Sequence, residues 1–227
     1  MSWQAERTGS FVNHITYPDI QESDYSNKAI QNINEITKFM RDNHWTDEAI
    51  AGMLGNIEAE SGFNPWRYYG DSVAGQSIAY GLVQFHPPSY YIGGEGVGKS
   101  GYAPSLGINN TQADDHASPS DGNAQCFVIN SETNTKYADK SSIMPAWDLS
   151  SVTTLADYKR CSDLETSTKA WLLNYETPST DPATLELIFG QRFLLASFIY
   201  NHLLPDKQYT PLYFYMGKKF KRKKGLL

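Results

Sequence analysis

The sequence has 227 residues, of which 40% are hydrophobic and 13% aromatic, so it can bury a core of domain size and is not a disordered chain. Its net charge is −6, but residues 218–227 contain six Lys or Arg and no acid; the chain before Gly217 has 13 basic against 25 acidic residues, a net −12. A body of this charge repels a phosphate backbone, so we expect no nucleic-acid partner.

The N-terminus lacks a basic flank followed by an apolar run, and no stretch approaches the roughly 18 apolar residues that cross a bilayer. We therefore expect no signal peptide and delivery by another carrier. Cys126 and Cys161 are too few for a disulfide framework, and a single disulfide or two buried thiols are equally open. Neither the cysteines nor the five scattered histidines show a zinc-binding spacing, so we expect no metal and no cofactor.

Residues 1–27 are polar and aperiodic, which indicates an arm rather than a domain. A first helix is expected after Ser26, which can cap it, and it ends near Asn43 and His44. Its predicted face consists of Ala29, Ile30, Ile33, Ile36, Thr37 and Met40.

A second helix is expected over residues 45–61, WTDEAIAGMLGNIEAES, with Thr46 as its cap and acidic residues in its first turn. Its apolar residues recur at the spacing of one helical face: Ile50, Met53, Leu54 and Ile57. Gly52 and Gly55 lie in its interior, where each costs roughly 1 kcal/mol relative to alanine. These glycines predict a close approach by another helix or by a ligand.

Two carboxylates, Glu58 and Glu60, flank this apolar stripe on opposite sides at 100° per residue. Partial burial beside a core can raise the pKa of a glutamate enough for it to donate a proton near neutral pH. Periodicity alone does not choose between the two.

Residues 78–85, IAYGLVQF, have the composition of a short strand, in which Gly81 indicates a bulge or a close backbone approach. From 93 to 150 the chain is rich in Gly, Ser, Asn, Asp and Pro, which predicts a long irregular insertion. Two further helical patterns follow, over 164–175 and 185–203, separated by a rigid turn with two prolines. We thus expect a mainly α-helical domain over residues 28–205 and a basic tail over 206–227.

Residues Gly93–Ser100, GGEGVGKS, fit the phosphate-binding pattern of nucleotide-binding proteins letter for letter. That loop must join a buried strand to a helix that begins at the phosphate. Prolines on both sides, including Pro87, Pro88 and Pro104, leave neither element. We interpret the match as chance and expect no nucleotide; a nucleotide-binding protein would be the alternative, with Lys99 essential.

Several short motifs occur in a definite order along the chain: Gly55-Asn56, Glu60-Ser61, Asn64-Pro65, Gly81-Leu82-Val83-Gln84-Phe85 and Tyr175-Glu176-Thr177-Pro178. Their order resembles the motifs of goose-type lysozymes and soluble lytic transglycosylases, and more closely those of phage tail lysozymes, which open the cell wall during genome entry. The resemblance covers about residues 30–204. Phe85 replaces the tryptophan that is more frequent in the family, and the insertion is longer than usual.

The resemblance implies a lysozyme-like helical domain with a small β or irregular excursion. It implies that Glu60 is the general acid, which protonates the glycosidic oxygen between N-acetylmuramic acid and N-acetylglucosamine. Ser61 and Gln84 would position this acid and contact the sugar. The cleft walls would be formed by Phe85, Tyr80 and Tyr175.

A second carboxylate is less clearly indicated, because relatives often use one glutamate together with water or the substrate's own 6-hydroxyl. Asp71 and Glu176 are the candidates, and Glu58 ranks below both. A structural role is the larger expectation for Glu176, as a helix cap or a partner of Arg192. Hydrolysis and transglycosylation both remain open.

The resemblance also implies bacterial peptidoglycan as substrate, other tail proteins as partners, and a place in the virion tail. The basic tail over 206–227 could attract anionic polymers or lipid head groups of the envelope. Two alternatives remain: an inactive tail component that binds glycan, and a wall hydrolase associated with conjugation.

Overall fold

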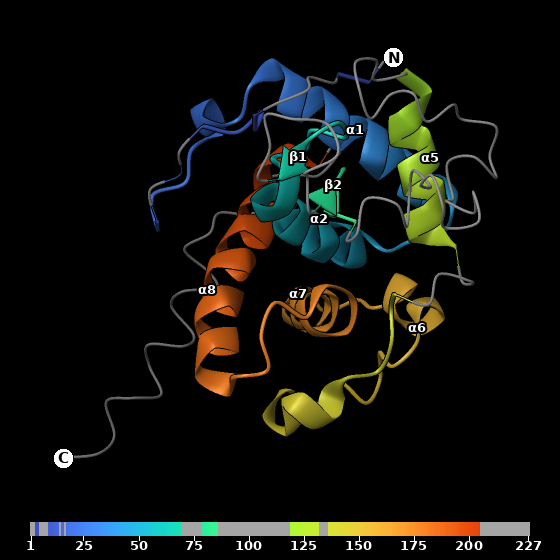
Figure 1. Cartoon of the computed structure of the whole chain (residues 1–227), viewed down its shortest axis with the longest axis vertical. Coiled ribbons are helices and arrows are strands. Elements are labelled where there is room, and N and C mark those ends of the chain that lie inside the picture. The colour runs from blue at the N-terminus through green and yellow to red at the C-terminus, as the bar shows by residue number, and fades with distance from the viewer. Residues whose placement is uncertain are drawn as a thin grey trace, which may run out of the picture.

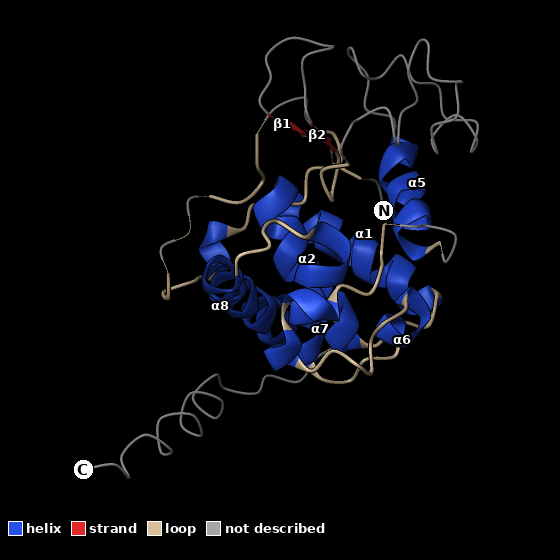
Figure 2. Cartoon of the chain, turned by 60° about the horizontal axis from the view of Figure 1, so that its bottom comes forward, coloured by secondary structure: helices blue, strands red, loops and turns tan. Residues whose placement is uncertain are grey.

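The computed structural model describes residues 3–4, 9–13, 15, 17–69, 79–85, 119–131 and 136–204, and helices make up most of this part of the chain (Figures 1 and 2). The longer helices are α1 (Asn27–Asp42), α2 (Asp47–Ser61), α5 (Pro119–Asn130), α6 (Leu155–Lys159), α7 (Leu164–Ala170) and α8 (Pro182–Phe198). Short helical turns are η1 (Glu22–Asp24), η3 (Ser141–Ile143), η4 (Pro145–Trp147), η5 (Trp171–Glu176) and η6 (Ile199–Leu203). β1 (Tyr68–Tyr69) pairs with β2 (Ala79–Tyr80) in antiparallel register. The mainly α-helical prediction is confirmed.

Helix α2 forms the centre of the fold, with α1, α7 and α8 packed around it (Figure 1). Its predicted start is confirmed, since the Thr46 hydroxyl accepts a hydrogen bond from the Ala49 amide. It ends at Ser61 and is followed by the C-cap residue Gly62, whose left-handed φ of 58° suits glycine. Every residue from Ala49 to Glu58 is buried. The burial thus extends beyond the predicted apolar stripe, because the small residues of the helix let neighbours cover the opposite face as well.

The two interior glycines of α2 explain this close packing. A Cβ atom at Gly52 would lie 2.7 Å from Cβ of Ser167 on α7, and one at Gly55 would lie 2.7 Å from the backbone oxygen of Arg192 on α8. Real Cβ atoms essentially never lie this close to a carbon or oxygen atom to which they are not bonded, so only glycine allows these helix contacts. The predicted close helix–helix approach is confirmed, and it brings α8 alongside the C-terminal half of α2.

Helix α5 lies within the segment over 93–150 that was expected to be irregular, and this expectation is wrong for residues 119–130. Its buried face contains the polar Gln125, which hid the helical pattern. The Gln125 amide donates a hydrogen bond of 2.6 Å to the Pro65 carbonyl, and its oxygen accepts one of 2.8 Å from the Leu82 amide. One side chain of α5 thus joins the end of the α2 motif to the turn after β2.

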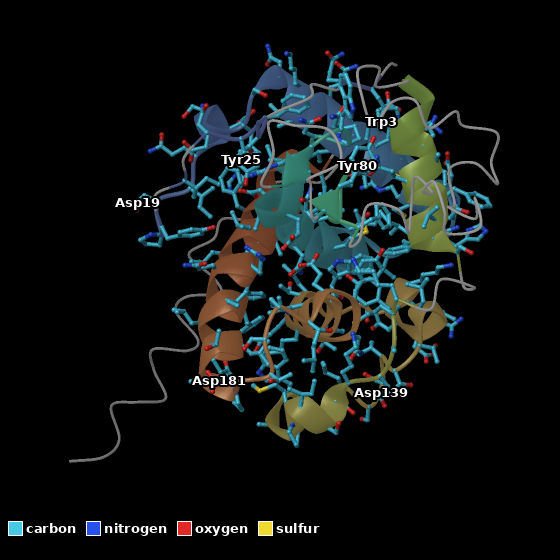
Figure 3. The ribbon with its side chains drawn as sticks, viewed as in Figure 1. Trp3, Asp19, Tyr25, Tyr80, Asp139 and Asp181 are labelled. Atoms are coloured by element: carbon cyan, nitrogen blue, oxygen red, sulfur yellow. The ribbon has the colours of Figure 1, made fainter. Side chains whose placement is uncertain are left out.

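The described parts of the N-terminal arm lie against the helical core. Trp3, Phe11 and Tyr25 are all buried. The Trp3 indole donates to Asn123 of α5 at 2.9 Å, and Figure 3 shows Trp3 beside this helix. The Phe11 amide donates to the Gly62 carbonyl at 3.2 Å. Aromatic side chains therefore anchor an arm whose overall composition is polar.

The Tyr25 hydroxyl donates a hydrogen bond of 2.7 Å to Oε2 of Glu58, which is only 6% exposed. Burial raises the pKa of Glu58 to about 8, and the Tyr25 hydrogen bond and the charge of Arg192 oppose this rise. Glu58 is thus a carboxyl group enclosed between α2 and the arm.

The two cysteine thiols, buried at Cys126 and half-buried at Cys161, are free, which excludes the disulfide alternative. Among the helices that the structure describes, none combines the length and the apolar character that a membrane crossing requires.

Replacing Gly55 with alanine is expected to destabilise the protein by about 1–3 kcal/mol, because the new methyl group collides with the α8 backbone. Gly190 is the matched control: it lies on α8, and a Cβ there meets nothing within 4 Å. Gly190→Ala should stabilise the protein by about 0.5–1 kcal/mol through helix propensity alone. Urea denaturation measures both, and equal effects would contradict the packing argument.

Glu58 should make stability depend on pH. Its native pKa of about 8 exceeds its ordinary value of 4.5, so the native state binds more protons than the unfolded state between these pH values. Stability is therefore fully present below pH 4.5 and is lost as the pH rises towards 8, with a slope of at most about 1.4 kcal/mol per pH unit for this group. Glu58→Gln should flatten the pH dependence of unfolding; an unchanged slope would refute the assignment.

Candidate active site at the end of helix α2

Glu60 lies two residues beyond the continuously buried part of α2, which ends at Glu58, and its side chain is 26% exposed. Nη2 of Arg192 lies 3.3 Å from its Oε1, and the arginine side chain is itself only 14% exposed. The close contact of α8 with Gly55 places Arg192 at this end of α2. Glu60 is thus a carboxylate that solvent reaches from one side and a guanidinium contacts from the other.

Glu176 is the last residue of η5, and its carboxyl group feels the charge of Glu60. The Trp171 indole donates a hydrogen bond of 3.2 Å to its Oε1, while Oε2 is buried with no hydrogen-bond partner among the described residues. Burial, and next the negative charge of Glu60, raise the pKa of Glu176 to about 8, against the opposing charges of Arg192 and Lys136.

The expected structural roles of Glu176 require correction. Its carboxyl group accepts from Trp171 in its own turn, and the Arg192 ion pair is formed with Glu60 instead. The π-helical winding of η5 accounts for this geometry, because it stacks Trp171 on Tyr175 with 4.1 Å between ring centroids. Single turns of this kind are frequent at functional sites.

Lys136 completes the cluster, and no sequence signal identified it. Its ammonium group lies 4.4 Å from the ring centroid of Tyr175 and donates a hydrogen bond of 3.3 Å to the Val83 carbonyl. Burial lowers the pKa of Lys136, opposed by the charges of Glu176 and Glu60. An isolated lysine in a polar segment has no periodicity and no motif, so only the tertiary structure reveals it.

Within the described residues 79–85, the expected strand is limited to β2 (Ala79–Tyr80), and a tight turn follows it. Tyr80 and Phe85 exchange backbone hydrogen bonds of 3.1 and 2.7 Å, which closes the turn. Gly81 has a φ of 83°, and a Cβ there would lie 2.5 Å from Oε1 of Gln125, so the predicted close approach is confirmed. The positive φ of residue 81 is the reason that the strand ends after Tyr80.

Gln84 also has a positive φ, of 46°, and only 8% of its surface is exposed. Its amide nitrogen donates to the Arg67 and Gly81 carbonyls at 3.2 and 2.9 Å. Its Oε1 is buried and has no hydrogen-bond partner in the described part of the chain. The side chain therefore stabilises the turn and keeps one acceptor unused.

The other residues predicted to contact substrate are buried. The Ser61 hydroxyl donates to the Ile57 carbonyl at 3.2 Å, inside its own helix. Tyr80, Phe85 and Tyr175 are at most 1% exposed. The expected cleft walls require exposed rings, and these three rings instead pack beneath the site, where Tyr175 and Phe85 face Lys136.

Three predictions lie outside the described residues: Asp71 as a second carboxylate, the pattern at Gly93–Ser100, and the basic tail over 206–227. Within the described residues, no group of three or more His, Cys, Asp or Glu is placed to bind a metal ion. What the structure brings together is one partly exposed carboxylate, one buried carboxyl and two cations, an arrangement suited to proton transfer.

The sequence matches the phage tail lysozyme family over residues 31–190. This range includes Glu60, the turn over 80–85 and Glu176. The chain is also similar to a protein named Morphogenesis protein 1 from Bacillus phage B103, with 33% identity over 75 residues, which cover 30% of this chain and 20% of that protein. The chain therefore spans about a fifth of that relative's length. Because the family match extends over well more than half of the residues and includes the whole carboxylate cluster, the chain belongs to the phage tail lysozyme family.

Proposed function

We propose that this chain is a phage lysin that cleaves the glycan strands of peptidoglycan between N-acetylmuramic acid and N-acetylglucosamine, with Glu60 as the general acid. The observation that carries the proposal is the position of Glu60, a carboxylate exposed on one side at the end of a buried helix in a member of this family. The Glu-Ser pair of the motif lies at this position in the sequence.

The exposed fractions of Glu58 and Glu60 distinguish these two carboxylates, which helical periodicity could not do. Glu60 is 26% exposed in its side chain, whereas Glu58 is 6% exposed and hydrogen-bonded to Tyr25. Only Glu60 can meet a glycosidic oxygen without unfolding of the arm. On giving up its proton it becomes a carboxylate, which the nearby Arg192 guanidinium stabilises. The leaving sugar hydroxyl receives the proton as positive charge develops at the anomeric carbon.

We assign supporting roles to the remaining predicted residues. Gln84 offers its unused Oε1 as an acceptor for a sugar hydroxyl or an acetamido N–H. Ser61 and the rings of Phe85, Tyr80 and Tyr175 shape the site from beneath. Water or the substrate's own 6-hydroxyl then attacks the anomeric carbon, which gives hydrolysis or an anhydro product.

The protein acts, in this proposal, as a virion tail component that opens the cell wall during genome entry, in contact with other tail proteins. The family name and the phage origin of the relative support this setting. Mass spectrometry of the released muropeptides distinguishes hydrolysis from transglycosylation, since anhydro ends appear only in the second.

Glu60→Gln is expected to reduce the rate of peptidoglycan lysis by at least about 100-fold, the lower range for loss of a general acid. A turbidity assay on a peptidoglycan suspension measures the rate, and circular dichroism checks the fold. Glu58→Gln is the matched control, one helical half-turn away, and should retain most of the activity. A Glu60→Gln protein that clears the suspension at the wild-type rate would overturn the proposal. Wild-type protein that binds peptidoglycan without releasing reducing ends would instead favour the inactive glycan-binding component.

A further inference from the structure

Gln84 has a backbone conformation that depends on its surroundings. Its φ of 46° lies in the left-handed region, which a residue with a Cβ atom keeps only when the structure around it imposes it. Its side-chain nitrogen donates to the Arg67 and Gly81 carbonyls, and its buried Oε1 has no hydrogen-bond partner in the described part of the chain. The contacts that hold the turn over 80–85 therefore also set the position of this acceptor.

Lys136 contacts this turn and η5 at the same time. Its Nζ donates a hydrogen bond of 3.3 Å to the carbonyl of Val83, the residue directly before Gln84. The same ammonium group lies 4.4 Å from the ring centroid of Tyr175 on η5 and 5.7 Å from that of Phe85, which follows Gln84. A cation over an aromatic ring is attracted by the negative face of that ring. One ammonium group thus holds both neighbours of Gln84 against η5.

The backbone that follows Lys136 is bound to η5. The Ala138 amide donates to the Asn174 carbonyl at 3.1 Å, and the Lys140 amide donates to Oδ1 of the same asparagine at 2.9 Å. The Lys140 ammonium group donates to the Asn174 carbonyl at 3.2 Å and to the hydroxyl of Thr177, the residue after η5, at 2.5 Å. Because its backbone is fixed on this side, the side chain of Lys136 links η5 to the turn.

We propose that Lys136 is a positioning residue that acts through Gln84. By holding the Val83 carbonyl and the Phe85 ring next to η5, it keeps the Gln84 acceptor in place for a sugar hydroxyl or an acetamido N–H. This inference rests on the proposed function, in which Gln84 contacts the glycan strand. A Gln84 side chain without this support would have to be ordered when substrate binds, and that cost falls on affinity rather than on the chemical step.

Lys136→Met tests the proposal, because methionine keeps an apolar side chain beside the two rings but donates no hydrogen bond to the Val83 carbonyl. We expect KM for a soluble glycan-strand fragment to rise about 10-fold, the effect of roughly one hydrogen bond, with kcat nearly unchanged. Lys136→Arg retains a cation and several donors and should recover most of the affinity. Loss of folded protein alone would lower kcat at constant KM, and that result would overturn the proposal.

Lys140→Met is the matched control. It removes a cation from the same segment, but among the described residues the hydrogen bonds of this ammonium group go to η5 and Thr177 and not to the turn. KM should therefore stay at the wild-type value. An equal rise of KM in Lys140→Met and Lys136→Met would assign the effect to the lost charge or to η5, and would reject a role through Gln84.

A double-mutant cycle tests whether Lys136 acts through Gln84. Gln84→Ala should raise KM by itself, because it removes the acceptor. In that background Lys136→Met should add little, since no side chain is left to position. Independent sites would instead multiply their effects on kcat/KM, and such a product would contradict the proposal.

A measurement without lysis separates this inference from the proposed function. NMR of protein labelled with ¹⁵N at the glutamine side chains follows the Gln84 amide, which Gln84→Ala assigns, and a titration with the tetramer of N-acetylglucosamine gives a dissociation constant in the Glu60→Gln background. Lys136→Met should shift the Gln84 signal and raise this constant about 10-fold, whereas Lys140→Met should change neither. These changes in a protein whose wild type does not lyse peptidoglycan would reject the proposed cleavage and keep the positioning role. Lysis by the wild type, with a Gln84 signal and a dissociation constant that Lys136→Met leaves unchanged, would reject the positioning role and keep the proposed cleavage.

Discussion

The close contact of α2 with α7 and α8 is the constraint on which the rest of the structure depends. At Gly52 and Gly55 the backbones approach so nearly that a single methyl group has no room. This contact buries α2 on almost every side from Ala49 to Glu58, so that its side chains reach solvent only near its two ends. It also places Arg192 at the C-terminal end, beside Glu60. The helix packing that stabilises the core thus also builds the electrostatic environment of the site.

A second consequence is the distribution of charge along α2. Glu58 and Glu60 lie on opposite sides of the helix, and each meets a different environment. Glu58 is enclosed with Tyr25 of the arm, where burial favours its neutral form. Glu60 instead forms an ion pair with Arg192 at 3.3 Å and is partly exposed.

Segments outside the motifs make this geometry possible. Gln125 of α5 binds the Pro65 carbonyl and the Leu82 amide, and so keeps the end of the α2 motif next to the turn over 80–85. Lys136 then joins this turn to η5 through Val83 and Tyr175. Both residues belong to the segment that composition alone marked as an irregular insertion. Its function within the described range is to connect the motifs in space.

The sequence by itself determined α1, α2 and the two late helices, because caps and a 3.6-residue period are local properties. The order of the motifs also selected Glu60 over Glu58 as the candidate acid. Only the tertiary structure decided that Tyr80, Phe85 and Tyr175 lie beneath the site instead of lining it, that Arg192 pairs with Glu60, and that Lys136 and Gln125 take part. These facts depend on contacts between segments far apart in the chain, and burial, pairing and charge interactions across such contacts leave no periodic signal in a single sequence.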